Sequence, residues 1–105
     1  MRRARIYMHG VPAGVLVEQV PGTDYVFSYE SDYTGPPVSL SLPLNQREYR
    51  FSGFPPFLEG LLPEGEMLEG LLRQNKIDRS DHFAQLTAVG QDTVGAVTII
   101  GEETA

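Results

Sequence analysis

FPPFLEGLLPEGE, residues 54–66, decides the fold of this chain, because the spacing of the apolar residues changes there. Adjacent apolar pairs stand at positions 57–58 and 61–62, a four-residue repeat that is typical of one face of a helix. Prolines at 55 and 56 suit the start of a helix, and Pro63 ends it. We therefore expect a short helix here, followed by a turn.

Downstream, the same spacing recurs at positions 67–68 and 71–72 and predicts a second helix. Glu69 and Arg73 lie four residues apart on it and are expected to pair. A third helix is expected to begin with Asp78 or Ser80 as its N-cap and to stop at Gly90 in the C′ position. Its inward-facing residues are expected to be Phe83, Leu86 and Val89.

The chain ends with a β-branched run at residues 94–100, VGAVTII, which predicts a last strand. Residues 101–105 are polar and are expected to form a flexible tail.

Upstream of residue 54, short extended segments alternate with turn residues, which is typical of an antiparallel meander. Residues 5–8 and 15–20 are expected to form a hairpin around a turn at 10–14. Residues 25–30 predict the clearest strand, with Tyr25, Phe27 and Tyr29 on one face. Residues 31–37 predict a loop, and two further strands are expected at 38–42, where apolar residues alternate with serines, and at 49–51.

Strands followed by helices and a returning strand indicate an α+β fold. We expect a single domain over residues 1–105, with a small antiparallel, barrel-like sheet, about three short helices and the last strand returning to the sheet. The composition is close to that of globular proteins, at 41% hydrophobic and 21% charged residues.

Charge and targeting signals narrow the class of function. The net charge of −6 opposes a phosphate backbone, so we expect no direct nucleic-acid binding. Acidic residues dominate between Arg50 and Arg73, where the charged residues are Glu59, Glu64, Glu66 and Glu69. The absence of cysteine, of a signal peptide and of a long apolar stretch favours a cytoplasmic protein without membrane contact.

The candidate catalytic residues are not spaced so that their side chains could form one active site. Ser80, Asp81 and His82 are adjacent, and adjacent helical residues point about 100° apart, so we interpret them as residues of a helix start. Asp78 and His82 could share a helix face, but two ligands make a poor metal site. Phosphate-binding and kinase signatures are absent. We expect no enzyme activity, no cofactor and no metal.

Three blocks in order resemble the N-terminal domain of HipA-family serine/threonine kinase toxins: residues 38–44, VSLSLPL, residues 57–66, and residues 88–97, AVGQDTVGAV. In that family the catalytic elements follow this domain. A free-standing version is similar to HipS, the antitoxin subunit of tripartite HipBST toxin–antitoxin systems. The resemblance implies a protein that neutralises a HipT-like or HipA-type kinase toxin, with a HipB-like DNA-binding protein as a further partner and a link to bacterial persistence.

The contact surface is hypothesised to be the turn between the first two helices, placed at the active-site cleft of the kinase. Its residues are Leu62, Pro63, Glu64, Gly65, Glu66, Met67 and Leu68, together with Glu59.

Three alternatives remain open. The turn could simply join two core helices, with Leu61, Leu62, Leu68, Leu71 and Leu72 in the core. The chain could instead be a structural N-terminal domain or fragment of a longer HipA-like kinase. The third alternative is an independent enzyme, which is disfavoured because the candidate residues do not form a catalytic site.

Overall fold

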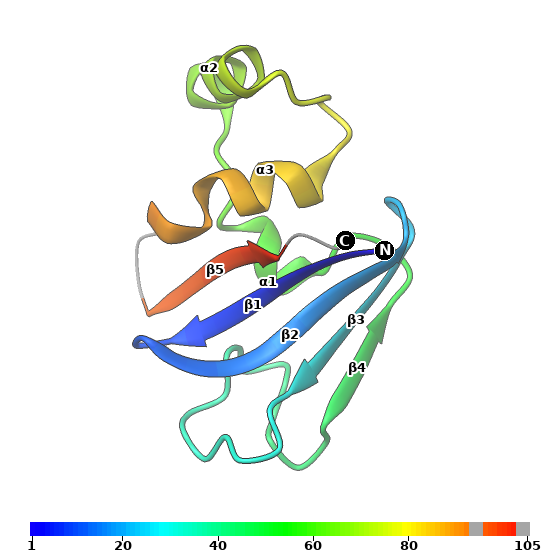
Figure 1. Ribbon diagram of the computed structural model, residues 1–105, viewed down its shortest axis with the longest axis vertical. Helices are drawn as coiled ribbons and strands as arrows, with labels where there is room; N and C mark the ends of the chain where they lie inside the picture. Colours follow the sequence, from blue (N-terminus) through cyan, green and yellow to red (C-terminus); the bar gives the residue numbers. More distant parts are fainter. Residues whose placement is uncertain (93–95, 103–105) are drawn as a thin grey trace.

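The computed structural model describes residues 1–92 and 96–102. It shows an open five-stranded antiparallel sheet with helices over one face (Figure 1). The strand order is β4-β3-β2-β1-β5. The strands are β1 (Arg2–Met8), β2 (Val11–Val20), β3 (Asp24–Tyr29), β4 (Glu48–Phe51) and β5 (Val97–Glu102). The helices are α1 (Pro56–Glu59), α2 (Gly65–Asn75) and α3 (His82–Val89), and a 3₁₀ turn, η1 (Gly90–Asp92), follows α3.

This architecture confirms the α+β class and the return of the last strand, which pairs with β1. The barrel-like expectation is wrong. Within the described residues β4 and β5 are the two edges of an open sheet and do not pair with each other.

The β1–β2 hairpin turns at His9 and Gly10, which have φ values of 51° and 80°. Two consecutive residues with positive φ make the tight turn that matches the twist of paired strands. The turn expected at residues 10–14 is therefore misplaced, because residues 11–14 already belong to β2. Pro12 sits beside a β-bulge opposite Tyr7, where its missing N–H is tolerated. His9 is exposed, as expected of a hairpin residue.

The inner face of the sheet forms the core. Tyr25, Phe27 and Tyr29 are all buried on one face of β3, which confirms the prediction. The same cluster includes Ile6, Leu16 and Ile99 from the other strands, Leu58 of α1, and Phe83 and Leu86 of α3. Burial of each such side chain contributes about 1.5–3 kcal/mol, so this face is the main source of stability.

The strand expected at residues 38–42 does not form. The N–H of Val38 donates to the hydroxyl of Tyr29 at 3.1 Å, and that hydroxyl donates to the carbonyl of Leu42. A turn bond from the Leu42 N–H to the Ser39 carbonyl, 3.0 Å, uses another backbone pair. These groups are thus bonded to a tyrosine and a turn instead of a neighbouring strand. Val38 and Leu42 are still buried, but Leu40 is 99% exposed.

The helices differ from expectation at their ends. α1 has only four residues, since Leu61 and Leu62 lie in a turn beyond it. The N-cap of α3 is Asp81, whose carboxylate accepts the Ala84 N–H at 3.2 Å, so neither Asp78 nor Ser80 has that role. Gly90 follows α3 as predicted, but its φ of −60° is right-handed.

The C-terminal predictions are partly tested. β5 includes Gly101 and Glu102, so the expected tail is wrong for these two residues. Residues 93–95 of the predicted region and 103–105 of the tail lie outside the described residues.

Candidate functional site

Aromatic contacts anchor the segment that leads to the predicted contact surface. Leu58 is completely buried. The Phe57 ring lies 5.8 Å from Phe27 and 6.0 Å from Phe51, centre to centre. Phe54 packs edge-on against Tyr25 at 5.7 Å. The chain is therefore firmly attached to the sheet up to the end of α1.

Beyond α1 the chain leaves the core. The N–H of Leu61 donates to the carbonyl of Leu58 at 3.0 Å, and that of Leu62 to Glu59 at 3.1 Å, which makes a tight turn. Leu61 and Leu62 are half-buried and pack against the core, as the alternative reading expected. The turn is shorter than predicted, because residues 65–68 already form the first turn of α2.

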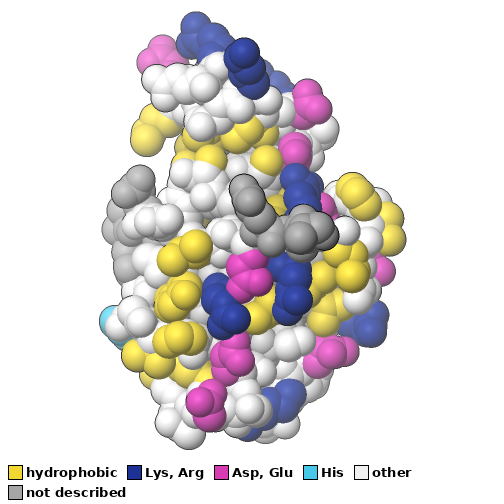
Figure 2. Space-filling model, viewed as in Figure 1, with side chains coloured by type: hydrophobic (Ala, Val, Ile, Leu, Met, Phe, Trp, Pro, Cys, Tyr) yellow, Lys and Arg dark blue, Asp and Glu magenta, His cyan; other side chains and the backbone are white. Residues whose placement is uncertain are grey.

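α2 stands apart from the rest of the molecule. It forms the upper lobe in Figure 1, and none of its residues is fully buried. Leu68, Leu71 and Leu72 are only half-buried, so their expected place in the core is wrong. Figure 2 shows hydrophobic side chains gathered in the neck between this lobe and the layer below. An amphipathic helix that meets the core only at its edge cannot bury its apolar face.

The start of α2 is open to solvent. Glu64, the N-cap residue, makes no side-chain capping bond, and Gly65 has a φ of 60°. Glu64, Gly65, Glu66 and Met67 are exposed, with Met67 at 77%. The backbone N–H groups of a first helical turn lack partners within the helix. The segment thus presents carboxylates and an apolar side chain together.

The charges of this surface are uncompensated. Glu59, Glu64 and Glu66 take part in none of the ion pairs found among residues 1–92 and 96–102. Glu69 bonds Arg79, so the expected pair with Arg73 is not formed. We call Glu59 and residues 62–68 the acidic surface. Its free carboxylates suit a basic partner group.

Two contacts that the sequence did not predict hold the base of the lobe. The amide of Gln85, 2% exposed, donates to the carbonyls of Asp78 and Arg79 at 3.2 and 2.9 Å, which fixes the segment that returns from α2 to α3. The Arg2 guanidinium bonds both oxygens of Asp81, at 3.0 and 2.8 Å, and Glu18 at 2.7 Å. The Arg2 hydrogen bonds hold the pKa of Asp81 below its ordinary value.

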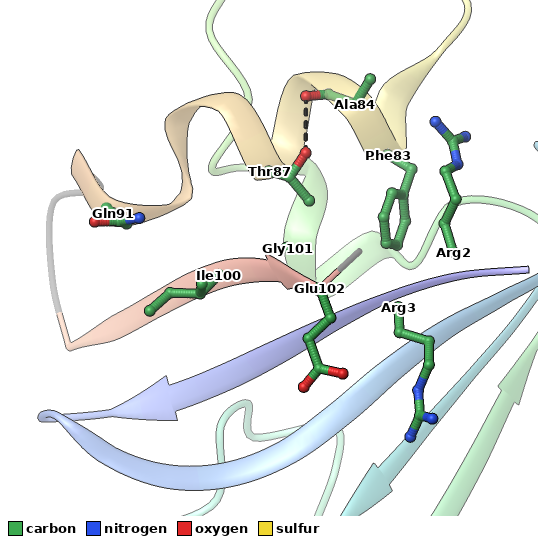
Figure 3. A pocket seen from close by; sticks show the side chains of 9 residues that line it. All are labelled: Arg2, Arg3, Phe83, Ala84, Thr87, Gln91, Ile100, Gly101 and Glu102. Atoms are coloured by element: carbon green, nitrogen blue, oxygen red, sulfur yellow. Dashed lines mark hydrogen bonds between the residues drawn. The ribbon is translucent and has the colours of Figure 1, made fainter. Parts of the chain in front are cut away.

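A pocket of about 400 Å³ lies between α3 and the end of β5 (Figure 3). Arg2 lies beside Phe83 on the helix side, whereas Arg3 and Glu102 point to the other side of the sheet. Since Arg2 is already bonded to two carboxylates, the polar groups here do not converge on a ligand. Among the described residues, no three His, Asp or Glu side chains form a metal-binding group.

Comparison with known proteins identifies the domain. The family model described as HipA N-terminal domain matches residues 4–100. The chain belongs to this family. A solved structure described as the N-terminal domain of HipA toxin superposes on this HipA N-terminal domain with a TM-score of 0.76, at 32% identity, and the match covers 100% of this chain and 96% of that one.

Two relatives place the HipA N-terminal domain in proteins of different length. An uncharacterized protein of Haemophilus influenzae is 34% identical over 103 residues, which are 98% of this chain and 95% of that protein. A putative kinase, Y4dM, of Sinorhizobium fredii is 32% identical in an alignment of 103 positions, which covers 90% of this chain but only 25% of the kinase. The domain thus forms nearly all of one relative and a quarter of the other.

None of the helices in the described part of the chain is long and apolar enough to span a membrane.

Proposed function

We propose that this HipA N-terminal domain binds a HipT-like or HipA-type serine/threonine kinase toxin and neutralises it as an antitoxin. The observation that carries the proposal is the acidic surface, in which the exposed and unpaired Glu64 and Glu66 stand beside the exposed Met67 at the start of α2, outside the core, with Glu59 at the end of α1. The Haemophilus relative supports a free-standing role, because the domain makes up 95% of that protein.

The mechanism we propose is occlusion of the kinase active-site cleft by the start of α2. Glu64 and Glu66 meet basic groups that a kinase uses for phosphates, and Met67 fills an apolar part of the cleft. The contacts of Phe54 and Phe57 with the sheet keep the base of the lobe in place. A HipB-like DNA-binding protein is a further proposed member of the complex.

Charge reversal tests the acidic surface. The double variant Glu64→Lys/Glu66→Lys should inhibit a purified HipA-type kinase from the same genome roughly tenfold less well or worse, because the paired charges become repulsive. Inhibition would be measured by transfer of labelled phosphate, and binding by calorimetry. Both side chains are exposed and unpaired, so the fold should be kept, with a small fall in melting temperature because lysines replace carboxylates at the start of α2.

The control places positive charge elsewhere, in Gln74→Lys/Gln91→Lys, at two exposed positions outside the acidic surface. This variant should inhibit like the wild type. Undiminished inhibition by the charge-reversed variant would show that the acidic surface is not the inhibitory element.

The second candidate is a non-catalytic N-terminal domain or fragment of a longer HipA-like kinase, with a structural role. The match to a quarter of the putative kinase favours it. The reading frame downstream of the coding sequence separates the two: a separate short kinase frame supports the antitoxin, and an uninterrupted kinase frame supports the structural domain.

A further inference from the structure

The orientation of α2 is not fixed by core packing. This helix forms the upper lobe in Figure 1, and none of its residues is fully buried. Its leucines, Leu68, Leu71 and Leu72, are half-buried and are not among the described side chains that pack against the core. Apolar contact has no direction of its own, so these leucines stabilise the lobe without determining how the acidic surface at its start is turned.

A single side chain connects α2 to the body of the molecule by a directional bond. Within the described part of the chain, the bond from the Arg79 guanidinium to the Glu69 carboxylate is the one hydrogen bond that joins α2 to a residue outside positions 64–77. Glu69 follows Glu66 by less than one helical turn. Arg79 therefore holds α2 close to the acidic surface.

The backbone of Arg79 is itself held by a buried side chain of α3. Gln85, 2% exposed, donates from its amide to the carbonyl of Arg79 at 2.9 Å and to that of Asp78 at 3.2 Å. The Asp78 carbonyl also accepts the N–H of Asp81 at 3.0 Å, which closes the turn before α3. The guanidinium of Arg79 thus extends from backbone that is fixed from the core side.

We infer that Arg79 is a positioning residue, which together with Gln85 holds the acidic surface in the orientation that the kinase binds. The polar connection runs from Gln85 through the backbone and guanidinium of Arg79 to Glu69. The inference rests on the proposed function and names what orients its contact surface. An exposed ion pair shifts an equilibrium between two orientations by up to roughly fivefold, and a surface that is correctly oriented less of the time binds more weakly in proportion.

The orientation of α2 can be measured without a kinase. The sequence contains no cysteine, so Gln19→Cys on β2 and Gln74→Cys on α2, both at exposed positions, can carry spin labels whose separation is measured by pulsed electron paramagnetic resonance. We expect a narrow distance distribution in this labelled protein and a broader one when Arg79→Met is added.

Arg73→Met is the matched control, because it removes the same charge from an exposed position on α2 itself. Arg73 takes part in none of the ion pairs found among residues 1–92 and 96–102. The distance distribution should therefore stay narrow in this control.

Binding tests whether the kinase requires this orientation. The dissociation constant of Arg79→Met for the purified HipA-type kinase, measured by calorimetry, should rise about threefold to fivefold, whereas Arg73→Met should bind like the wild type. The melting temperature of Arg79→Met should change little, because Arg79 and Glu69 are both exposed.

Gln85→Met breaks the connection at its core end while keeping a side chain of similar length. It should also broaden the distance distribution, and its melting temperature should fall because two backbone carbonyls lose their donor. A distribution that stays narrow in Gln85→Met would overturn the part assigned to Gln85.

Two results overturn the part assigned to Arg79. One is a distance distribution as narrow in Arg79→Met as in the labelled protein without it. The other is a broader distribution together with kinase binding within about 1.5-fold of the wild type. If the wild type does not bind the kinase, the proposed function falls and the kinase part of the inference with it, while the distance distributions still decide whether Arg79 holds α2.

Discussion

At the scale of the residue, Glu18 shows how a charge is accommodated on the inner face of the sheet. It is 2% exposed, and its carboxylate accepts hydrogen bonds from Arg2 at 2.7 Å, from the Tyr25 hydroxyl at 2.8 Å and from the Gly22 N–H at 3.2 Å. The Arg2 guanidinium also lies 4.9 Å over the Phe83 ring. One arginine therefore connects β1, β2 and α3.

Arg2→Met should lower the free energy of unfolding by about 3 kcal/mol, because it leaves the buried Glu18 without its cationic partner while keeping an apolar stem beside Phe83. The double variant Arg2→Met/Glu18→Gln should recover part of this loss, since no buried charge remains. Urea unfolding measures both. The Arg2 side chain is partly exposed, so water lies close to this site. A loss below about 1 kcal/mol in the single variant would mean that water stabilises the Glu18 carboxylate in place of Arg2.

At the scale of the element, the packing of α3 against β5 depends on a residue without a side chain. A Cβ on Gly90 would lie 2.2 Å from the carbonyl oxygen of Ile99 and 2.7 Å from its Cβ. Since the φ of Gly90 is ordinary, close approach to β5 is the reason for glycine here.

Gly90→Ala should therefore cost about 2 kcal/mol or more of unfolding free energy, because backbone must move to relieve the overlap. Gly60→Ala is the matched control: its φ is −65°, its Cβ would meet nothing within 4 Å, and it should be neutral or stabilise by about 0.5–1 kcal/mol. Thermal and urea unfolding compare the two. Equal effects at both positions would contradict the packing argument.

At the scale of the whole molecule, proton binding limits the pH range of stability. Hydrogen bonding by Arg2 keeps the pKa of Asp81 below its ordinary 3.8, and burial raises the pKa of Tyr25 and of Tyr29 above 10. The folded state binds fewer protons than the unfolded chain in acid and more in alkali. Stability is therefore lost as pH falls below about 4 and as it rises above about 10.

Urea unfolding between pH 2 and pH 11 should show both declines. Asp81→Asn should flatten the acid decline, and Tyr29→Phe should flatten the alkaline one, since each removes a titrating group whose pKa differs between the two states. An acid decline of unchanged slope in Asp81→Asn would show that other carboxylates cause it.

Local patterns in the sequence were sufficient for the α+β class, for most strands and for the buried face of β3, because alternation along a strand directly encodes which side is buried. Asp81 was recognised as a residue of a helix start for a similarly local reason. The exposed carboxylates of the acidic surface could also be predicted, since charged side chains stay in water unless paired.

Only the tertiary structure decided the rest. The alternation at residues 38–42 predicts a strand, but the Tyr29 hydroxyl, distant in sequence, takes the backbone groups that pairing would need. The leucines of α2 have the spacing of core residues, yet the helix lies at the edge of the molecule. Three further features depend on which distant segments meet: the open edges of the sheet, the contacts of Gln85 and the exposure of Leu40. A sequence pattern shows that a face is apolar, and only packing determines what covers it.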